Sequence, residues 1–243
     1  MYFAHTPTLW SAFPSLVPGV LLVEGVGPDA VVSAHLPPLF DRARTRLAAG
    51  GESDLPEVQA WRRAFSQLGL KPTQYRSAAE ALLRRFRKED SLPSLHPLVD
   101  LCNAVSLAYA LPVAVFDLDQ VAGFLEVRYA DGDEIVLAFD GEIEHPEAGE
   151  VIFADAARQV HARRWTFRQT RRSVVSAATA RALIVSEGLH PTAAADVPAL
   201  IATLEVELHA VGFAPSRRAI LSAANPRWLM EDAHVAPTRP AAH

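Results

Sequence analysis

The sequence predicts an α+β fold, in which a mixed and mostly antiparallel sheet is packed against helices. Two observations support this class. The first half of the chain carries apolar residues at helical spacing, whereas from residue 113 onward short apolar runs are divided by turn residues. Helices followed by consecutive strands indicate α+β rather than the alternating strands and helices of a Rossmann or TIM fold. With 243 residues, of which 50% are hydrophobic, the chain can bury a substantial core.

Several elements follow directly from apolar patterns and their end signals. A strand-like run covers residues 20–23, and a helix is expected over residues 37–47 after two consecutive prolines. A mostly apolar helix is expected over residues 98–110. The last helix begins with Asp196 as its cap and stops at Gly212.

Two further helices are predicted from capping boxes. Asp54 is followed three positions later by Glu57, and the helix that they open ends at Gly69. Ser77 is followed in the same way by Glu80, at the start of a helix that runs to about residue 88. We therefore expect both helices to begin with a side chain that accepts a hydrogen bond from the first turn.

The second half of the chain is expected to form mainly strands, and the composition also indicates where the domain ends. The predicted strands are residues 113–116, 124–129, 134–139, 151–155 and 181–186. We expect a single domain over residues 1–213. We expect a partly disordered tail over residues 214–243, because this segment is rich in proline, alanine and arginine.

Composition excludes several classes of protein. The net charge of −5 argues against a broadly cationic nucleic-acid binder, and we expect no DNA partner. No uncharged apolar stretch reaches the roughly 18–20 residues that span a bilayer, so no membrane partner is expected. The first 23 residues carry no lysine or arginine, which argues against a secretory signal and favours the cytoplasm. The single cysteine, Cys102, allows no internal disulfide and no cysteine-based zinc site.

The usual signatures of cofactor, metal and nucleophile chemistry are missing. The sequence has no glycine-rich phosphate loop, no His-Glu-x-x-His motif and no Gly-x-Ser-x-Gly elbow. We therefore expect neither a cofactor nor a metal. Cys102 lies within an apolar helix pattern, which favours a buried, inert thiol over a nucleophile.

Charge is distributed unevenly along the second half. Residues 129–157 hold nine acidic residues and no lysine or arginine, and residues 158–181 hold seven arginines and no acidic residue. These stretches are either complementary faces of the fold or, in the arginine stretch, a contact with a polyanion. On the helix before the strands, Asp100 and Asn103 are three residues apart and share a face. They either clamp the following loop or border a pocket.

At these residues the sequence resembles a known family, the B3/B4 domain of the bacterial phenylalanyl-tRNA synthetase β subunit, and more closely the free-standing B3/B4 proteins. The resemblance covers about residues 60–190. It is carried by the runs Val99-Asp-Leu-Cys-Asn103, Phe116-Asp-Leu-Asp119, Leu125-Glu-Val-Arg128, Val151-Ile-Phe-Ala-Asp155 and Arg163-Arg-Trp-Thr-Phe-Arg-Gln169. The last run is typical of the free-standing group.

The resemblance implies a pocket between helix and sheet that hydrolyses mischarged aminoacyl-tRNA. Asn103 matches an asparagine of the synthetase pocket, and Cys102 stands where the synthetases have a threonine. Ala114 replaces their pocket histidine. Val185 takes the position of a glutamate that contacts the rejected side chain, and Glu187, two residues further on the same strand face, could substitute for it.

The leading hypothesis is therefore a free-standing editing factor, not a complete synthetase, that binds the aminoacylated 3′ end of tRNA and cleaves its labile ester with a positioned water. Asn103 and Gln169 would orient the ester or the water. The expected pocket residues are Asp100, Cys102, Ala114 and Glu187, and the expected tRNA contacts are Arg163, Arg164, Trp165 and Arg168. Residues 163–169 also fit an exposed strand with its aromatic side chains packed inward. A non-catalytic binding module and a small-molecule hydrolase or amino-acid-binding protein are the alternatives.

Overall fold

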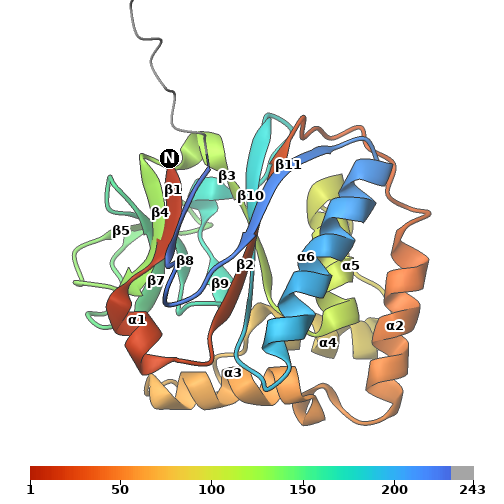
Figure 1. Ribbon diagram of the computed structural model, residues 1–243, viewed down its shortest axis with the longest axis horizontal. Coiled ribbons are helices and arrows are strands. Elements are labelled where there is room, and N and C mark those ends of the chain that lie inside the picture. Colours follow the sequence, from red (N-terminus) through yellow and green to blue (C-terminus); the bar gives the residue numbers. More distant parts are fainter. Residues whose placement is uncertain (231–243) are drawn as a thin grey trace, which may run out of the picture.

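Two β-sheets lie side by side at the centre of the protein (Figure 1). The computed structural model describes residues 1–230. The smaller sheet has the strand order β11 (Ala214–Ile220), β2 (Val17–Glu24), β10 (Arg181–Gly188) and β3 (Val113–Asp117), and all of its neighbours are antiparallel.

The larger sheet has eight strands and mixed directions. Its order is β12 (Arg227–Leu229), β1 (Tyr2–His5), β4 (Phe124–Tyr129), β7 (Val151–Asp155), β8 (Gln159–Arg163), β5 (Ile135–Leu137) and β6 (Ile143–Glu144), and β9 (Arg168–Gln169) also pairs with β8. The pairs β1–β4 and β5–β8 are parallel, and the other pairs are antiparallel. The predicted α+β class with a mostly antiparallel mixed sheet is thus confirmed.

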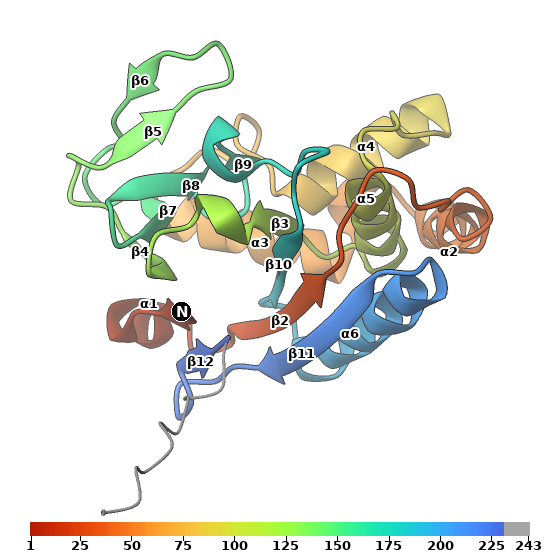
Figure 2. The same ribbon diagram turned by 90° about the horizontal axis from the view of Figure 1, so that it is seen from above.

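Helices cover the outer face of the smaller sheet and the lower edge of both sheets. Figure 2 shows the smaller sheet between the larger one and α2 (Leu36–Ala48), α5 (Pro97–Tyr109) and α6 (Ala193–Ala210). The remaining α-helices of the described chain are α1 (Pro7–Ala12), α3 (Pro56–Gln67) and α4 (Ala78–Glu89), and the 3-10 turns are η1 (Glu52–Asp54), η2 (Leu118–Gln120) and η3 (Arg171–Ser173). Within residues 1–230, no helix is both long and apolar enough to cross a membrane.

The smaller sheet is buried on both faces, which explains its uninterrupted apolar strands. Side chains alternate across a strand, so Leu21 and Val23 of β2 pack toward α5 and α6, whereas Val20 and Leu22 pack toward the larger sheet. Gly19 lets α6 approach closely, because a Cβ there would lie 2.7 Å from the side chain of Ile201. The protein therefore has two principal cores, one on each side of this sheet.

Two of the three predicted helix caps are wrong. Ser77 caps α4 as expected, and its Oγ accepts a hydrogen bond from the Glu80 amide at 3.3 Å. The cap of α3 is Leu55, because Asp54 instead accepts a hydrogen bond from the Gly51 amide at 2.9 Å. The partner of Glu57 is Arg46 in α2, at 2.8 Å.

The start of α6 and the expected tail also differ from the predictions. The cap position of α6 is Thr192, and Asp196 lies in the first turn, where it accepts a hydrogen bond from the Thr192 hydroxyl at 2.6 Å. Part of the expected tail is ordered: β11 pairs with β2 along its length, and β12 pairs with β1. The prediction of partial disorder for residues 231–243 lies outside the described residues.

Candidate functional site

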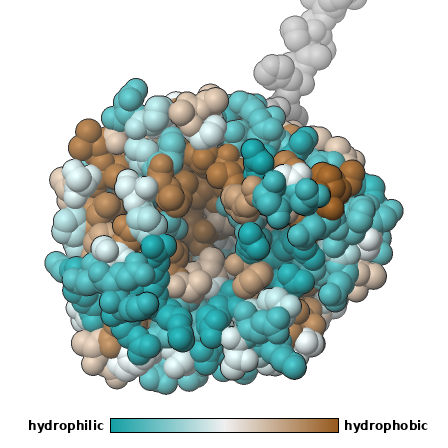
Figure 3. Space-filling view, turned by 180° about the vertical axis from the view of Figure 1, so that it is seen from behind, coloured by the Kyte–Doolittle hydropathy of each residue, from teal (hydrophilic) through white to brown (hydrophobic). Residues whose placement is uncertain are grey.

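A cavity of about 400 Å³ opens between α4, α5, the β8–β9 hairpin and the inner face of the smaller sheet. Figure 3 shows a hollow on this side of the molecule that is apolar inside and is bordered by hydrophilic residues mainly on the right and below. Most of the wall is apolar, and the polar groups are few. The lining residues are Ala78, Ala81, Leu82, Leu95, Val99, Asn103, Pro112, Val113, Ala114, Phe139, Phe153, Ala162, Trp165, Thr166, Phe167, Arg168, Gln169, Val185 and Glu187.

Strand register places three lining residues on one wall. Ala114 of β3 is paired directly with Val185 of β10, so their side chains project from the same face of the sheet. Glu187 lies two residues after Val185 and therefore points to the same side. The structure thus brings Ala114 and Glu187, two of the predicted pocket residues, to the same wall of this cavity.

Glu187 is a buried carboxylate held by two donors. Its side chain is 2% exposed. His5 Nε2 lies 2.6 Å from Glu187 Oε1, and Trp165 Nε1 lies 3.0 and 3.1 Å from the two carboxylate oxygens. The carboxylate thereby joins β1, the β8–β9 hairpin and β10. Sequence analysis missed His5, which lies 182 positions before Glu187 and carries no local signal of this contact.

Trp165 is a core residue and not an exposed stacking platform for RNA. Its side chain is fully buried and packs edge-on against Trp61 and Phe13, with ring centroids 4.9 Å apart in both pairs. The backbone has φ +59° at Trp165 and +46° at Arg164, a conformation that costs about 1–2 kcal/mol for such residues. This turn inserts the indole beside Glu187, so the prediction that Trp165 contacts tRNA directly is corrected.

Gln169 and Asn103 bring carboxamides to the cavity wall. Gln169 Nε2 donates to the carbonyl oxygens of Val115 and Ser173, at 2.8 and 3.1 Å. Its Oε1 has no hydrogen-bond partner among the described residues, so it can accept a hydrogen bond from a ligand. Asn103 is half-buried, and in the described part of the chain its carboxamide forms no hydrogen bond. Both predicted catalytic groups therefore retain polar atoms for a ligand.

Asp100 and Cys102 lie outside this cavity. Asp100 accepts hydrogen bonds from the Leu95 amide at 2.8 Å and the Ser94 hydroxyl at 2.7 Å, so it clamps the loop before α5 rather than the loop after it. With Asn103, it lines a neighbouring cavity of about 480 Å³. Cys102 packs in the core between α5 and the smaller sheet, and burial raises the pKa of its thiol.

The three arginines predicted to bind tRNA differ in whether their guanidinium groups are already paired within the protein. Arg163 forms a two-point ion pair with Glu150, at 3.0 Å for both bonds, and a further one with Glu144 at 2.6 Å. Arg164 lies 3.8 Å from Glu150 and over the ring of Tyr75. The guanidinium of Arg163 is therefore already paired within the protein, and that of Arg164 has most of its contacts there.

Arg168 is exposed at the rim of the cavity, with its guanidinium 5.6 Å from the ring centroid of Phe139. Arg171 and Arg172 are exposed in the following turn, and none of these three arginines forms an ion pair with another described residue. The acidic and arginine stretches thus complement each other at Arg158 and Arg163. They leave Arg168 without an ion pair at the cavity rim, and Arg171 and Arg172 without one in the turn that follows β9, among the described residues.

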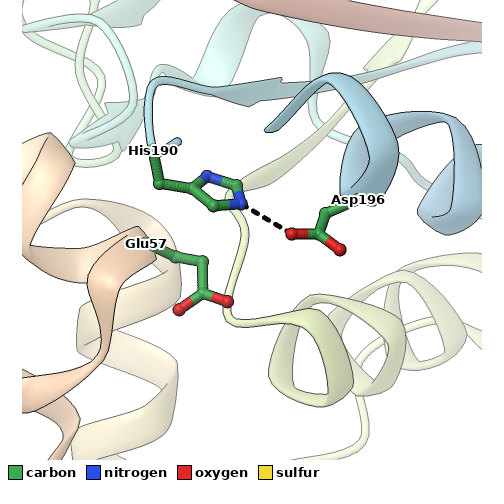
Figure 4. A group of neighbouring side chains, drawn as sticks. All are labelled: Glu57, His190 and Asp196. Carbon is green, nitrogen blue, oxygen red and sulfur yellow. Dashed lines mark hydrogen bonds and ion pairs between the residues drawn. The ribbon is translucent and has the colours of Figure 1, made fainter. Parts of the chain in front are cut away.

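Within residues 1–230, two groups of side chains could hold a metal ion. Asp131, Asp133 and Glu134 gather in a turn, where Arg128 and Arg158 already form ion pairs with them. Glu57, His190 and Asp196 form the second group (Figure 4). Neither group lines the cavity.

Comparison with known proteins identifies the class of protein to which this fold and cavity belong. Residues 60–198 match the family model of the B3/4 domain. This match covers more than half of the chain, and the chain belongs to the B3/4 domain family. The predicted resemblance is confirmed.

The individual relatives are subunits of one enzyme. The chain is 31% identical over 137 residues to the phenylalanine–tRNA ligase beta subunit of Yersinia pestis, a match that covers 55% of this chain and 17% of that subunit. It is 24% identical over 143 residues to the same subunit of Photorhabdus laumondii, covering 58% of this chain and 18% of the relative. The match thus spans less than a fifth of the length of these relatives.

A solved structure was also found to be similar. It is an N-terminal fragment of the phenylalanyl-tRNA synthetase beta subunit from Pyrococcus horikoshii, with a TM-score of 0.47 and 10% identity, and the match covers 88% of this chain and 49% of that one.

Proposed function

We propose that this protein hydrolyses the ester bond of mischarged aminoacyl-tRNA. The observation that carries the proposal is the cavity itself: an apolar chamber with two carboxamides, Asn103 and Gln169, on its wall and a buried carboxylate, Glu187. Apolar pockets with a few placed polar groups are typical of small-molecule sites. Membership of the B3/4 family, with beta subunits of a tRNA ligase among the relatives, supports an aminoacyl group as the occupant.

In this proposal the amino-acid side chain enters the cavity and the ester lies near the two carboxamides. Asn103 donates a hydrogen bond to the oxyanion that develops during attack, and Gln169 Oε1 accepts one from the attacking water or from the ammonium of the substrate. The nucleophile is water. Cys102 cannot serve, because it lies in the core and burial disfavours its thiolate.

The 3′ end of the tRNA would approach over the cavity rim. Arg168, Arg171 and Arg172 are the cations available to its phosphates, since Arg163 is already paired with buried Glu150. An exposed guanidinium binds phosphate with two parallel hydrogen bonds and without breaking an internal ion pair.

The experiment is deacylation of a panel of mischarged tRNAs by the purified protein and by Asn103→Ala. Removal of an oxyanion donor lowers kcat by about 10²–10³-fold. Asn225→Ala is the matched control, because Asn225 is the other asparagine of the chain and is exposed. If the parent protein deacylates no member of the panel, or if Asn103→Ala deacylates at the parental rate, the proposal is wrong.

A non-catalytic binding module is the second candidate. The observation that favours it is that Glu187 and the amide nitrogen of Gln169 already have partners within the protein. Such a module would bind tRNA with a strong dependence on salt and would show no turnover in the same assay.

A further inference from the structure

Three potential metal ligands converge at a point that does not belong to the cavity. Glu57 comes from the first turn of α3, His190 from the loop between β10 and α6, and Asp196 from the first turn of α6 (Figure 4). One ligand atom from each residue lies within 4.8 Å of the other two. The three segments are distant in sequence, which is why no helix-spaced motif indicated the group.

Glu57 brings an unpartnered, buried oxygen to this group. Its side chain is 7% exposed, and its Oε1 pairs with Arg46 at 2.8 Å. Its Oε2 is buried and has no hydrogen-bond partner in residues 1–230. Figure 4 shows the carboxylate next to the imidazole of His190. A buried acceptor without a donor is costly, because the charge has left water without compensation.

Charge in the group is also unbalanced. Glu57 and Asp196 carry two negative charges, and Arg46 supplies one positive charge. In this group two carboxylates therefore lie beside a single arginine.

A proton and a metal ion would balance this charge differently. Nε2 of His190 lies 2.9 Å from Asp196 Oδ2, so a proton there serves Asp196 alone and leaves Glu57 Oε2 without a partner. A divalent ion between the three side chains would serve both carboxylates. The side chain of Asp196 is 31% exposed, which gives the ion a route from solvent and leaves room for coordinated water.

We propose that His190, Asp196 and Glu57 bind a divalent transition-metal ion, with Zn²⁺ as the favoured class. One imidazole and two carboxylates form a ligand set that suits zinc, with water in the remaining position. The ion joins α3, the loop after β10 and the start of α6. Its role is structural, because β10 carries Val185 and Glu187 of the cavity wall, and fixing the end of this strand fixes that wall.

The test uses the purified full chain after treatment with a chelator. Zn²⁺ is added during isothermal titration calorimetry and during thermal unfolding, and Co²⁺ is added to record its visible absorption. We expect one saturating equivalent and a Tm that rises with the free metal concentration, because an ion that binds only the folded state stabilises it by mass action. His190→Ala, Asp196→Asn and Glu57→Gln should each weaken binding by at least about tenfold.

The matched control is Asp133→Asn, in the other group of potential ligands, which should bind as the parent does. Circular dichroism establishes that each variant is folded. If His190→Ala does not fold, Asp196→Asn decides the question, because its side chain is partly exposed. Absence of saturable binding overturns the proposal. So does binding that survives in a folded Asp196→Asn or His190→Ala protein but is lost in Asp133→Asn.

Discussion

On the proposed function, the surroundings of Glu187 bear on which amino-acid side chains the cavity accepts. The walls around it are apolar at Ala114 and Val185, and the carboxylate is already bonded to His5 and Trp165. A substrate hydroxyl would have to compete with these two donors, whereas an apolar side chain leaves both bonds intact. The volume of the substrate side chain, rather than its hydrogen bonding, should therefore decide which substrates the cavity accepts.

On the proposed function, tRNA charged with tyrosine and tRNA charged with phenylalanine should be hydrolysed at similar rates. Selection by size alone is worth about 1–3 kcal/mol, or roughly 10–200-fold, whereas a site that bonds a hydroxyl reaches far higher ratios. The measurement is the ratio of kcat/KM for the two esters. A preference for tyrosine above about a thousandfold would mean that Glu187 exchanges an internal donor for the substrate.

Glu134 makes the free energy of unfolding depend on pH in the acid range. Its side chain is fully buried and accepts hydrogen bonds from the Asp131 and Gly132 amides, both at 3.0 Å, and from Arg128. Burial alone would raise the pKa of Glu134, but these donors outweigh it and lower the pKa to about 2, from an ordinary value of 4.5. The unfolded chain therefore takes up this proton at higher pH than the folded chain.

The stabilisation from Glu134 should be complete above pH 4.5 and should be lost as the pH falls toward about 2. Its size is about 3 kcal/mol. Urea unfolding of Glu134→Gln should show a deficit of this order at pH 7 that shrinks in acid. Glu142→Gln, at an exposed position in the next turn, is the control. A deficit that is independent of pH would contradict the assignment.

At the scale of elements, the β8–β9 hairpin separates structural arginines from available ones. Arg163 holds Glu150, whose side chain is 4% exposed, and Arg168 projects from the rim. Although both residues lie in the same hairpin, replacing Arg163 should change mainly the free energy of unfolding, whereas replacing Arg168 should change mainly tRNA binding.

Arg168→Ala should reduce the salt dependence of tRNA binding by roughly one unit of slope for each lost phosphate contact, and should leave the free energy of unfolding nearly unchanged. Arg163→Ala should lower the free energy of unfolding by about 1.5–3 kcal/mol, because Glu150 loses its two-point partner and keeps only the Arg164 amide at 3.1 Å and the Arg164 guanidinium at 3.8 Å. The salt slope of tRNA binding should be preserved in this variant. Salt titrations of tRNA binding and urea unfolding of both variants check this. A reduced salt slope of tRNA binding in Arg163→Ala would mean that Arg163 contacts the RNA.

Elements with long apolar patterns could be predicted from the sequence. The helix α5 and the strands β4, β7 and β10 lie where the patterns place them. The short strands β1, β6, β9 and β12 were missed, because two to four residues carry no periodicity. The longer strands β8 and β11 were missed as well, since each contains arginine or polar residues among few apolar ones and is ordered by pairing with its neighbours. The cap at Asp54 was wrong because Asp54 closes the local η1 turn by accepting a hydrogen bond from the Gly51 amide, and Glu57 pairs with Arg46 of α2.

The family resemblance and simple element geometry together indicated part of the candidate site. The resemblance pointed to Ala114, the strand period extended it from Val185 to Glu187, and a shared helix face singled out Asn103; all three line the cavity. Cys102 was misplaced because adjacent helix residues project about 100° apart, so a residue next to Asn103 faces the core instead. Trp165 was assigned to the tRNA contacts, but its ring is buried, as in the alternative with inward-packed aromatic side chains. It is carried by a turn with two consecutive positive φ angles rather than by a strand.

At the scale of the whole molecule, the segment after α6 completes both sheets. β11 covers the edge of β2, and β12 pairs with β1 through Phe3 and Trp228. Leu221 and Met230 are buried in the core that also contains Phe3. Both sheets therefore depend on residues near the end of the described chain.

A chain ending at Phe213 should consequently be much less stable than one ending at Met230, which keeps both strands and is the matched control. The shorter chain loses the burial of Leu221 and Met230, worth about 1.5–3 kcal/mol each, and it exposes the backbone donors and acceptors of β2. We expect its free energy of unfolding to fall by at least about 3 kcal/mol, and size-exclusion chromatography to show association through the uncovered edge. Equal stability of the two chains, measured by urea unfolding, would mean that the sheets hold together without β11 and β12, and that the core around Phe3 closes by other contacts.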